Sequence, residues 1–271
     1  MPELPEVETT RRGLAPFVVN QRIAAAIVRN HALRWPVSHS LPRLVSGTTI
    51  AAIGRRGKYL LFDCGTGTLI LHLGMSGRLW IVDRASAPET HDHFDLVLAS
   101  GTIVRLRDPR RFGLIVWGNG DPLRHALLAG IGPEPFDGAF NGEWLYRITR
   151  SRTAAIKQVL MDGHVVAGVG NIYANEALFR AGINPRQPAQ RIGLARCGLL
   201  AEKIRETLEL AIGAGGSSLR DYVGSDGMAG RFQSQFMVYD RAGEACHRCR
   251  TPIRGIRQGQ RSTFYCPRCQ R

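Results

Sequence analysis

Apolar and polar residues alternate along the first half of the chain with the period of two that is typical of half-buried β-strands. Between Arg22 and Val116 this alternation predicts short strands, most of them separated by glycine, asparagine or serine. The predicted strands cover residues 23–28, 49–53, 58–62, 68–73, 79–82, 94–98, 103–106 and 114–117. So many short strands in succession favour a β-sandwich.

Helical patterns flank the predicted strands on both sides. Pro5 suits the first position of a helix and acidic residues suit its first turn, so we expect a helix over residues 6–14 that packs against the sandwich. Further helices are expected over 142–150, 154–161, 171–181 and 194–212, the last with apolar residues at helical spacing. The pattern predicts an α+β chain with a sandwich domain over 1–130, a helical domain over 131–235 and a small module over 236–271.

The strong positive charge of the chain favours nucleic acid as its partner. The 271 residues include 36 basic and 22 acidic side chains, which gives a net charge of +14. Residues 241–271 carry half of this excess, because eight arginines stand there against one acid, Glu244. A merely solubilising charge or an arginine-biased genome is the alternative explanation.

The composition also excludes several classes of protein. With 44% hydrophobic residues, the chain can bury a substantial core. No apolar run approaches the roughly 18 residues needed to span a bilayer, and the start of the chain lacks an apolar secretion signal. We therefore expect a folded cytoplasmic protein with no membrane partner.

Two Cys-x-x-Cys pairs near the end of the chain predict a metal site. Sixteen residues separate the pairs, a spacing that matches a tetrahedral four-cysteine zinc site. The expected ligands are Cys246, Cys249, Cys266 and Cys269. Disulfides are the alternative, but nothing in the sequence indicates export to an oxidising compartment. Arginines between the pairs, Arg261 among them, would give this hairpin a phosphate-binding surface, whereas Cys64 and Cys197 are expected to be buried thiols.

Three glycine-rich loops carry candidate DNA-contacting residues. One is Gly-Met-Ser-Gly with Met75, and another is the DPRRFG sequence of residues 108–113. Loop-borne Met, Arg and Phe side chains fit wedges that enter a base stack, although a hydrophobic plug over the end of the sandwich is the alternative. The third is the turn at residues 168–173, which places Asn171 where a helix cap belongs. Such a helix start would be either a phosphate site or an ordinary loop-to-helix junction.

The N-terminus offers a candidate nucleophile. A small second residue such as Pro2 is compatible with removal of Met1, which would expose a secondary amine. An α-amino group has a pKa of about 7.7–8.0 against about 10.4 for lysine, so far more of it is nucleophilic at neutral pH. A proline amine that attacks an aldehyde-like carbon gives a permanently charged iminium, which is a strong electron sink. Glu3 and Glu6 could move protons there, or could simply favour the helix dipole.

Together these residues resemble the bacterial formamidopyrimidine-DNA glycosylases. The resemblance spans residues 2–271 in one collinear order and rests on PELPEVET at residues 2–9, the Lys58 turn, DPRRFG, the turn at 168–173 and the four-cysteine finger. It implies an N-terminal β-sandwich with flanking helices, a helix–two-turn–helix domain and a zinc-finger hairpin with one structural Zn²⁺. It also implies a monomer without an organic cofactor, acting on damaged double-stranded DNA.

By this resemblance, each motif residue acquires an expected role. Pro2 is similar to the family's Schiff-base nucleophile, Glu3 to the acid that opens the deoxyribose, and Glu6 to its second carboxylate. Lys58 is expected to complete the catalytic set with these three residues, and with Asn171 and Arg261 it would contact phosphates near the lesion. The remaining residues expected to bind DNA are Met75, His91, Arg110, Arg111, Phe112 and Lys157. Met75, Arg110 and Phe112 would fill the gap left by the flipped base, and residues 217–239 would cover that base.

The resemblance further implies a reaction. Pro2 would attack C1′ and displace an oxidised purine such as 8-oxoguanine or a formamidopyrimidine, after which β- and δ-elimination would open the strand. Two rivals are a glycosylase of the endonuclease VIII type, which prefers oxidised pyrimidines, and a non-catalytic protein that recognises damage. Leu4, with the Met75 and DPRRFG loops, favours the purine-directed branch over the first rival, and an intact Pro2 behind a removable Met1 speaks against the second.

Overall fold

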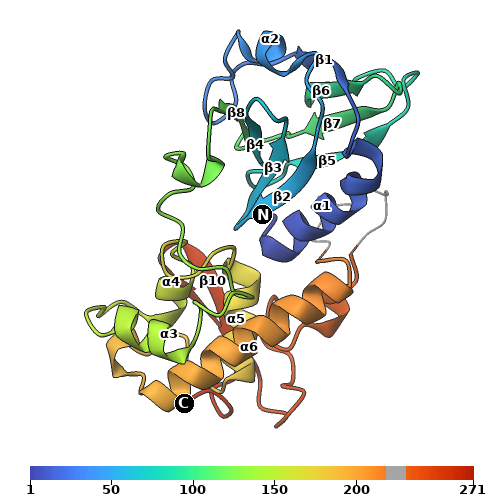
Figure 1. Cartoon of the computed structure of the whole chain (residues 1–271). Helices are drawn as coiled ribbons and strands as arrows, with labels where there is room; N and C mark the ends of the chain where they lie inside the picture. The colour runs from blue at the N-terminus through green and yellow to red at the C-terminus, as the bar shows by residue number, and fades with distance from the viewer. Residues whose placement is uncertain (218–229) are drawn as a thin grey trace. The chain divides into compact units, whose positions relative to one another are not determined.

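In a computed structural model that describes residues 1–217 and 230–271, the chain forms two compact units (Figure 1). The first combines Met1–Ala129 with Ala214–Arg231, and the second combines Gly130–Gly213 with Phe232–Arg271. Among the described residues, none of the helices has both the length and the hydrophobicity to cross a membrane. Each unit buries apolar residues of its own.

The first unit contains two antiparallel four-stranded sheets. In spatial order, one sheet consists of β1 (Ile23–Val28), β6 (Asp92–Leu98), β7 (Ile103–Arg107) and β5 (Arg78–Val82). The other consists of β2 (Ala52–Arg56), β3 (Tyr59–Asp63), β4 (Thr68–His72) and β8 (Leu114–Gly118). Two helices, α1 (Leu4–Val18) and α2 (Leu41–Val45), flank them.

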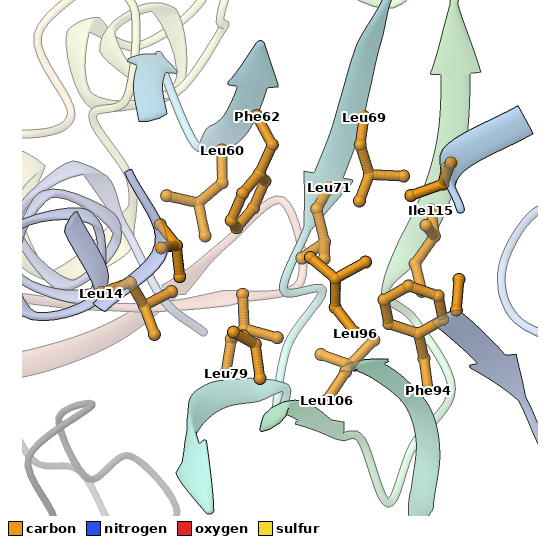
Figure 2. Packing of buried hydrophobic residues seen from close by; sticks show 14 of the residues in the cluster. Leu14, Leu60, Phe62, Leu69, Leu71, Leu79, Phe94, Leu96, Leu106 and Ile115 are labelled. Carbon is orange, nitrogen blue, oxygen red and sulfur yellow. The ribbon is translucent and has the colours of Figure 1, made fainter. Parts of the chain in front are cut away.

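Facing side chains of the two sheets form one apolar core, which confirms the predicted sandwich. Figure 2 shows these residues meeting between the sheets, and all of them are almost completely buried. The core includes Leu60, Phe62, Leu69 and Leu71 from one sheet and Leu79, Phe94, Leu96 and Leu106 from the other. Leu14 on α1 extends the same cluster, so the first helix packs against the sandwich as its pattern predicts.

Some predicted boundaries in this unit are wrong. The strand predicted over 49–53 is β2, which begins only at Ala52, because Ile50 exchanges backbone hydrogen bonds with Asn20 and Gln21 instead of with β3. Lys58 lies in the turn between β2 and β3 and not in a strand. The helix predicted from residue 6 starts at Leu4. The five-residue α2 was not predicted, because one turn and a half is too short to show a period.

The second unit is helical and ends in a hairpin, in agreement with the predicted order of elements. Its helices are α3 (Gly142–Thr149), α4 (Ile156–Leu160), α5 (Asn171–Arg180) and α6 (Leu194–Gly213), and its hairpin is β9 (Arg254–Gln258) with β10 (Arg261–Tyr265). The helix predicted over 154–161 is shorter, since Ala155 pairs with Pro188 in a β-bridge before α4 begins. Asn171 is the first residue of α5, and Gly170 takes the cap position predicted for Asn171.

A buried carboxylate on α1 fixes the helix to the sheet. Glu8 accepts hydrogen bonds from Arg11 Nη2 at 2.8 Å and Arg12 Nε at 2.7 Å on its own helix. It also pairs with Arg55 Nε of β2 at 3.2 Å. Burial raises the pKa of Glu8, but the hydrogen bonds and positive charge of these arginines outweigh burial and lower it to about 2.

We expect Glu8→Gln to lower the free energy of unfolding at pH 7 by about 1–2 kcal/mol, less than the full pKa shift implies, because the arginines are partly in water. Since the folded-state pKa of about 2 lies below the ordinary value of 4.5 for a glutamate, the carboxylate stabilises the fold above pH 4.5. This stabilisation is lost as the pH falls towards 2. Urea unfolding at pH 7, 5 and 3 should therefore show the difference between wild type and variant shrinking at pH 3.

The matched control is Glu202→Gln, which makes the same change at an exposed carboxylate paired with Lys203. It should change stability by less than about 0.5 kcal/mol at every pH. A Glu8→Gln deficit that stays constant from pH 7 to pH 3 would contradict the ion-pair explanation.

Candidate active site and nucleic-acid interface

The start of α1 gathers the candidate catalytic residues. Glu3 precedes the helix in an extended conformation, and its backbone N–H donates to Glu6 Oε2 at 2.8 Å, in the arrangement of a capping box. Glu3 and Glu6 are each only 2% exposed, and Pro2 is buried beside them. The sequence therefore places two carboxylates next to Pro2 because the same residues begin the helix.

Glu6 also binds a segment more than 200 residues away in sequence. Its Oε1 accepts from the backbone N–H of Ser217 at 2.8 Å and from the Ser217 hydroxyl at 2.9 Å. Gly216 has φ +82°, and a Cβ there would lie 3.1 Å from Glu6 Oε1, so glycine permits this approach. Ser217 pairs with Arg231 in a β-bridge, so the carboxylate lies where the two ends of this segment meet.

The Glu6–Ser217 contact was not predicted. The only trace of it in the sequence is the run Gly215-Gly216-Ser217, which does not identify its partner. Of the stretch 217–239 that was expected to cover the flipped base, residues 218–229 lie outside the described part of the chain.

Lys58 lies in the turn between β2 and β3, and residues next to it contact α1 and β4. Arg55, which pairs with Glu8, donates to the carbonyl of Gly57 at 3.1 Å and so fixes the turn relative to the first helix. Tyr59 packs on His72 of β4 with ring centroids 4.8 Å apart. Lys58 is thus held at a defined place in the N-terminal unit.

His72 is a buried neutral residue next to these cations. Burial lowers its pKa, and the charges of Lys58 and Arg34 lower it further, to about 4. Its Nδ1 accepts from the backbone N–H of Gly74 at 2.9 Å, which requires the neutral ring. Sequence reasoning missed His72, because a single histidine in an apolar strand does not reveal its neighbours.

The two loops with wedge-like side chains lie against each other. Met75 is half-buried, while Arg110, Arg111 and Phe112 are exposed. The guanidinium of Arg110 lies 4.9 Å from the centre of the Phe112 ring. Because Phe112 remains 42% exposed, its ring lies on the surface and does not plug the sandwich.

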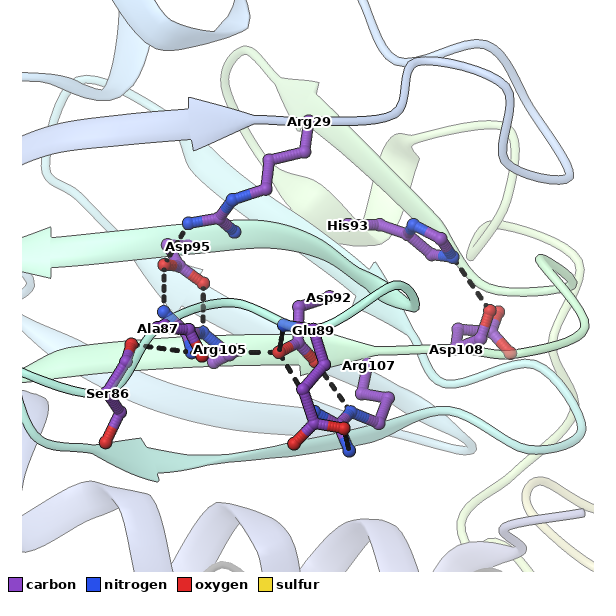
Figure 3. Close-up of polar contacts among 10 residues, drawn as sticks. All are labelled: Arg29, Ser86, Ala87, Glu89, Asp92, His93, Asp95, Arg105, Arg107 and Asp108. Atoms are coloured by element: carbon purple, nitrogen blue, oxygen red, sulfur yellow. Dashed lines mark hydrogen bonds and ion pairs between the residues drawn. The ribbon is translucent and has the colours of Figure 1, made fainter.

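His91 precedes β6 on a loop that an ion-pair network fixes (Figure 3). Asp92 accepts from Arg107 Nε at 2.7 Å, and the adjacent Arg105 donates to Asp95 and to the carbonyls of Ser86 and Ala87. Burial raises the pKa of Asp92, but the hydrogen bonds from Arg107 and the backbone of Glu89, together with the charges of Arg107 and Arg105, outweigh it and keep that pKa below its usual range. The exposed imidazole of His91 therefore lies on an ordered surface loop.

Hydrogen bonds and a ring contact connect the candidate residues of the first unit to one another. The start of α1 is tied through Glu8 and Arg55 to the Lys58 turn. That turn neighbours His72, whose ring binds the backbone of the Met75 loop. The structure thus brings residues from distant parts of the sequence into one connected region of the N-terminal unit.

In the second unit, Lys157 and Arg261 belong to a contact between α4 and the hairpin. Lys157 is 1% exposed, and its ammonium donates to the carbonyl of Ser262 at 2.8 Å and to Thr263 Oγ1 at 2.6 Å. Arg261, the first residue of β10, is exposed. The ammonium of Lys157 is therefore satisfied inside the protein and supports the strand that carries Arg261.

Asn171 begins α5 and is half-buried. Its Oδ1 has no hydrogen-bond partner among the described residues, while its backbone carbonyl accepts from Asn175 at 2.6 Å. Gly168, with φ +79°, provides the turn that leads into the helix.

The four cysteines of the finger form a compact cluster. Their sulfur atoms all lie within 4.8 Å of one another, with Cys249 and Cys266 at 3.4 Å and Cys246 and Cys269 at 4.0 Å. None of these cysteines is in a disulfide. Sulfurs about 2.3 Å from a central zinc lie about 3.8 Å apart, so the cluster fits the ion. One structural zinc, with all four positions taken by thiolates, replaces the core that this short segment cannot make.

Models of known protein families match three consecutive parts of the chain. Residues 1–115 match the formamidopyrimidine-DNA glycosylase N-terminal domain, and residues 131–223 match the glycosylase H2TH domain. Residues 243–271 match the zinc finger found in FPG and IleRS. These matches confirm the expected helix–two-turn–helix domain and zinc finger.

Full-length relatives carry the same description. The chain is 54% identical to the formamidopyrimidine-DNA glycosylase of Ralstonia nicotianae, with 100% of both chains covered. It is 53% identical to that of Methylobacillus flagellatus, with 100% of this chain and 96% of the relative covered.

Solved structures show the same fold. A Thermus thermophilus MutM (FPG) protein superposes with a TM-score of 0.89 at 38% identity, covering 99% of this chain and 98% of the other. A Lactococcus lactis FPG mutant in complex with Fapy-dG DNA superposes with a TM-score of 0.93 at 36% identity over 100% of both chains. On sequence and fold together, the chain belongs to the formamidopyrimidine-DNA glycosylase family.

Proposed function

We propose that this chain is a base-excision repair enzyme that removes oxidised purines, 8-oxoguanine and formamidopyrimidines, from double-stranded DNA and then cleaves the abasic site. The observation that carries the proposal is the start of α1, where Pro2 lies beside the two buried carboxylates Glu3 and Glu6. The Lactococcus lactis relatives in complex with Fapy-dG DNA and with abasic-site DNA support the substrate class.

The chemistry begins at the secondary amine that removal of the exposed Met1 gives to Pro2. Its nitrogen lone pair bonds to C1′ of the damaged nucleotide and the amine gives up its N–H proton, while the bond from C1′ to the base breaks and the base leaves with the electron pair of that bond and one proton. Glu3 protonates the ring oxygen of the deoxyribose, so the sugar opens to an iminium on Pro2. Removal of a C2′ proton expels the 3′ phosphate, and a second elimination expels the 5′ phosphate. Water then releases the sugar fragment from Pro2.

Glu6 has a supporting part in this scheme. One of its oxygens binds the backbone of Glu3, and the other binds Ser217, so the carboxylate sets the position of Glu3 next to Pro2. Through Ser217 it also binds a second part of the N-terminal unit, at the β-bridge of Ser217 with Arg231.

The remaining site residues would hold and distort the DNA. We propose that Lys58, Asn171 and Arg261 bind phosphates around the lesion, which agrees with the +14 charge of the chain. Met75, Arg110 and Phe112 would occupy the space that the flipped nucleotide leaves, because base excision requires taking the nucleotide out of the stack.

Three further residues complete the proposed interface. Arg111 and His91 would contact the DNA backbone from neighbouring loops of the sandwich. Lys157 would act through the hairpin, because its ammonium binds Ser262 and Thr263.

Borohydride trapping tests the nucleophile. Incubation with an 8-oxoguanine:C duplex and borohydride should give a covalent protein–DNA adduct that peptide mapping places on Pro2, because reduction fixes the iminium. The matched control is the same chain with Met1 retained, verified by mass, which should bind the duplex but give no adduct. An adduct on a lysine, or no adduct from chain that has lost Met1, would overturn the proposed mechanism.

The choice of lesion separates this proposal from an enzyme of the endonuclease VIII type. Incision of an 8-oxoguanine:C duplex should be faster than incision of a thymine glycol:A duplex of the same sequence, measured under single-turnover conditions. A strong preference for thymine glycol would assign the chain to oxidised pyrimidines.

Substitution of Arg261 tests whether the zinc finger contacts DNA phosphates. Arg261→Ala should weaken binding to damaged DNA and reduce the slope of log Kd against log salt by about one unit, because one phosphate contact is lost. Zinc content should remain one ion per chain, since the four thiolates are untouched. The control is Arg124→Ala, a highly exposed arginine outside the proposed interface, which should leave the slope unchanged. An unchanged slope in Arg261→Ala would show that this residue contacts no phosphate.

A further inference from the structure

Asp108 is a completely buried carboxylate placed between the two loops that carry the wedge residues. Its Oδ1 accepts from the hydroxyl of Ser76 at 2.9 Å, in the loop of Met75. Its Oδ2 accepts from the backbone N–H of Gly113 at 2.7 Å, directly after Phe112. One carboxylate therefore binds both loops at once.

The backbones of the two loops also touch at this point. Gly74 has φ +64°, and a Cβ there would lie 2.4 Å from the carbonyl carbon of Phe112. A Cβ on Gly113 would lie 2.9 Å from the carbonyl oxygen of His72. Since neither glycine could carry a side chain without displacing backbone, the sequence is adapted to this close contact.

Backbone hydrogen bonds of Asp108 also connect these two loops to the His91 loop. Its N–H donates to the carbonyl of His91 at 3.0 Å, and its carbonyl oxygen lies 3.0 Å from His93 Nε2, a contact drawn in Figure 3. The same carbonyl accepts from the N–H of Arg111, whose φ of +55° is uncommon for a residue with a side chain. The loop conformation that exposes Arg110 and Phe112 is thus imposed by bonds to Asp108.

We infer that Asp108 is a positioning residue that holds Met75, Arg110 and Phe112 as one rigid wedge for base eversion. This inference rests on the proposed function. An aspartate is required because both partners donate, and an ionised carboxylate offers two acceptor oxygens where an asparagine offers one. Asp108 itself contacts no DNA in this scheme, because it is buried beneath the loops that would.

If Asp108 holds the wedge in place, its loss should affect base excision and cleavage of abasic DNA to different degrees. Eversion of a stacked, paired lesion needs the wedge, because unstacking and unpairing the base cost free energy that the inserted side chains offset. A preformed abasic site has no base to unstack, and its capture by Pro2 depends much less on the wedge. Loss of Asp108 should therefore impair base excision far more than cleavage of abasic DNA.

The experiment compares both activities in the full-length chain. Asp108→Ala should lower single-turnover excision of 8-oxoguanine by ~10²-fold, the size of effect that misplacement by about 1 Å can cause. Trapping on a preformed abasic duplex should remain close to wild type. A 2-aminopurine beside the lesion should show a smaller rise in fluorescence than with wild type, because less unstacking occurs.

Milder variants keep the test informative if Asp108→Ala does not fold. Ser76→Ala removes one of the two hydrogen bonds to the Asp108 side chain, and Asp108→Asn keeps one acceptor oxygen. Both variants should therefore lower base excision more than abasic-site trapping, by a smaller factor than Asp108→Ala. The matched control is Asp162→Ala, which removes a carboxylate that likewise accepts from one side chain, Arg152 at 2.8 Å, and from one backbone N–H, that of His164 at 3.0 Å. It should lower stability while leaving the ratio of excision to abasic-site trapping at the wild-type value.

Two results would overturn the inference while leaving the proposed function intact. One is excision at the wild-type rate by folded Asp108→Ala. The other is a parallel loss of excision and abasic-site trapping in Asp108→Ala and Ser76→Ala, which would indicate a general structural role. Failure of the wild-type chain to trap on abasic DNA would instead contradict the proposed function itself.

Discussion

The apolar layer between the two sheets is the interaction on which the N-terminal unit depends. Alternate residues of each strand face this layer, and residues such as Phe62 and Phe94 bury large side chains there. Because the strands are fixed in this way, the turns and loops at their ends can hold polar and exposed groups in set positions. Lys58, Met75 and Phe112 all belong to such connections.

The second unit combines an apolar core with buried polar groups and a metal site. Glu176 of α5 is completely buried, where it pairs with Arg180 at 2.7 Å and accepts backbone N–H groups from Met237, Val238 and Tyr239. The chain leading into the finger is therefore bound to a helix by a carboxylate, and the finger itself by zinc and by Lys157. These polar groups and the metal add to the unit's own apolar core, in which Leu160, Leu178 and Ile204 are almost completely buried.

Sequence periodicity and motif spacing predicted the elements well, and contacts between distant residues poorly. The alternation of residues located β1 at Ile23–Val28 without error, because strand period and burial are properties of neighbouring residues. The cysteine spacing likewise identified the metal cluster. By contrast, the contacts of Ser217 with Glu6 and of Ser76 with Asp108 join residues far apart in the chain. Nothing local in a serine or an aspartate specifies such a partner.

The β-bridge between Ser217 and Arg231 limits what changes in the sequence between these two residues can disturb. The bridge and Glu6 fix both ends of the intervening segment, so its length and composition can vary without disturbing the start of α1. Doubling such a loop costs only about 0.6 kcal/mol in closure entropy. Substitutions and insertions between residues 217 and 231 can therefore accumulate while Glu3 and Glu6 keep their positions beside Pro2.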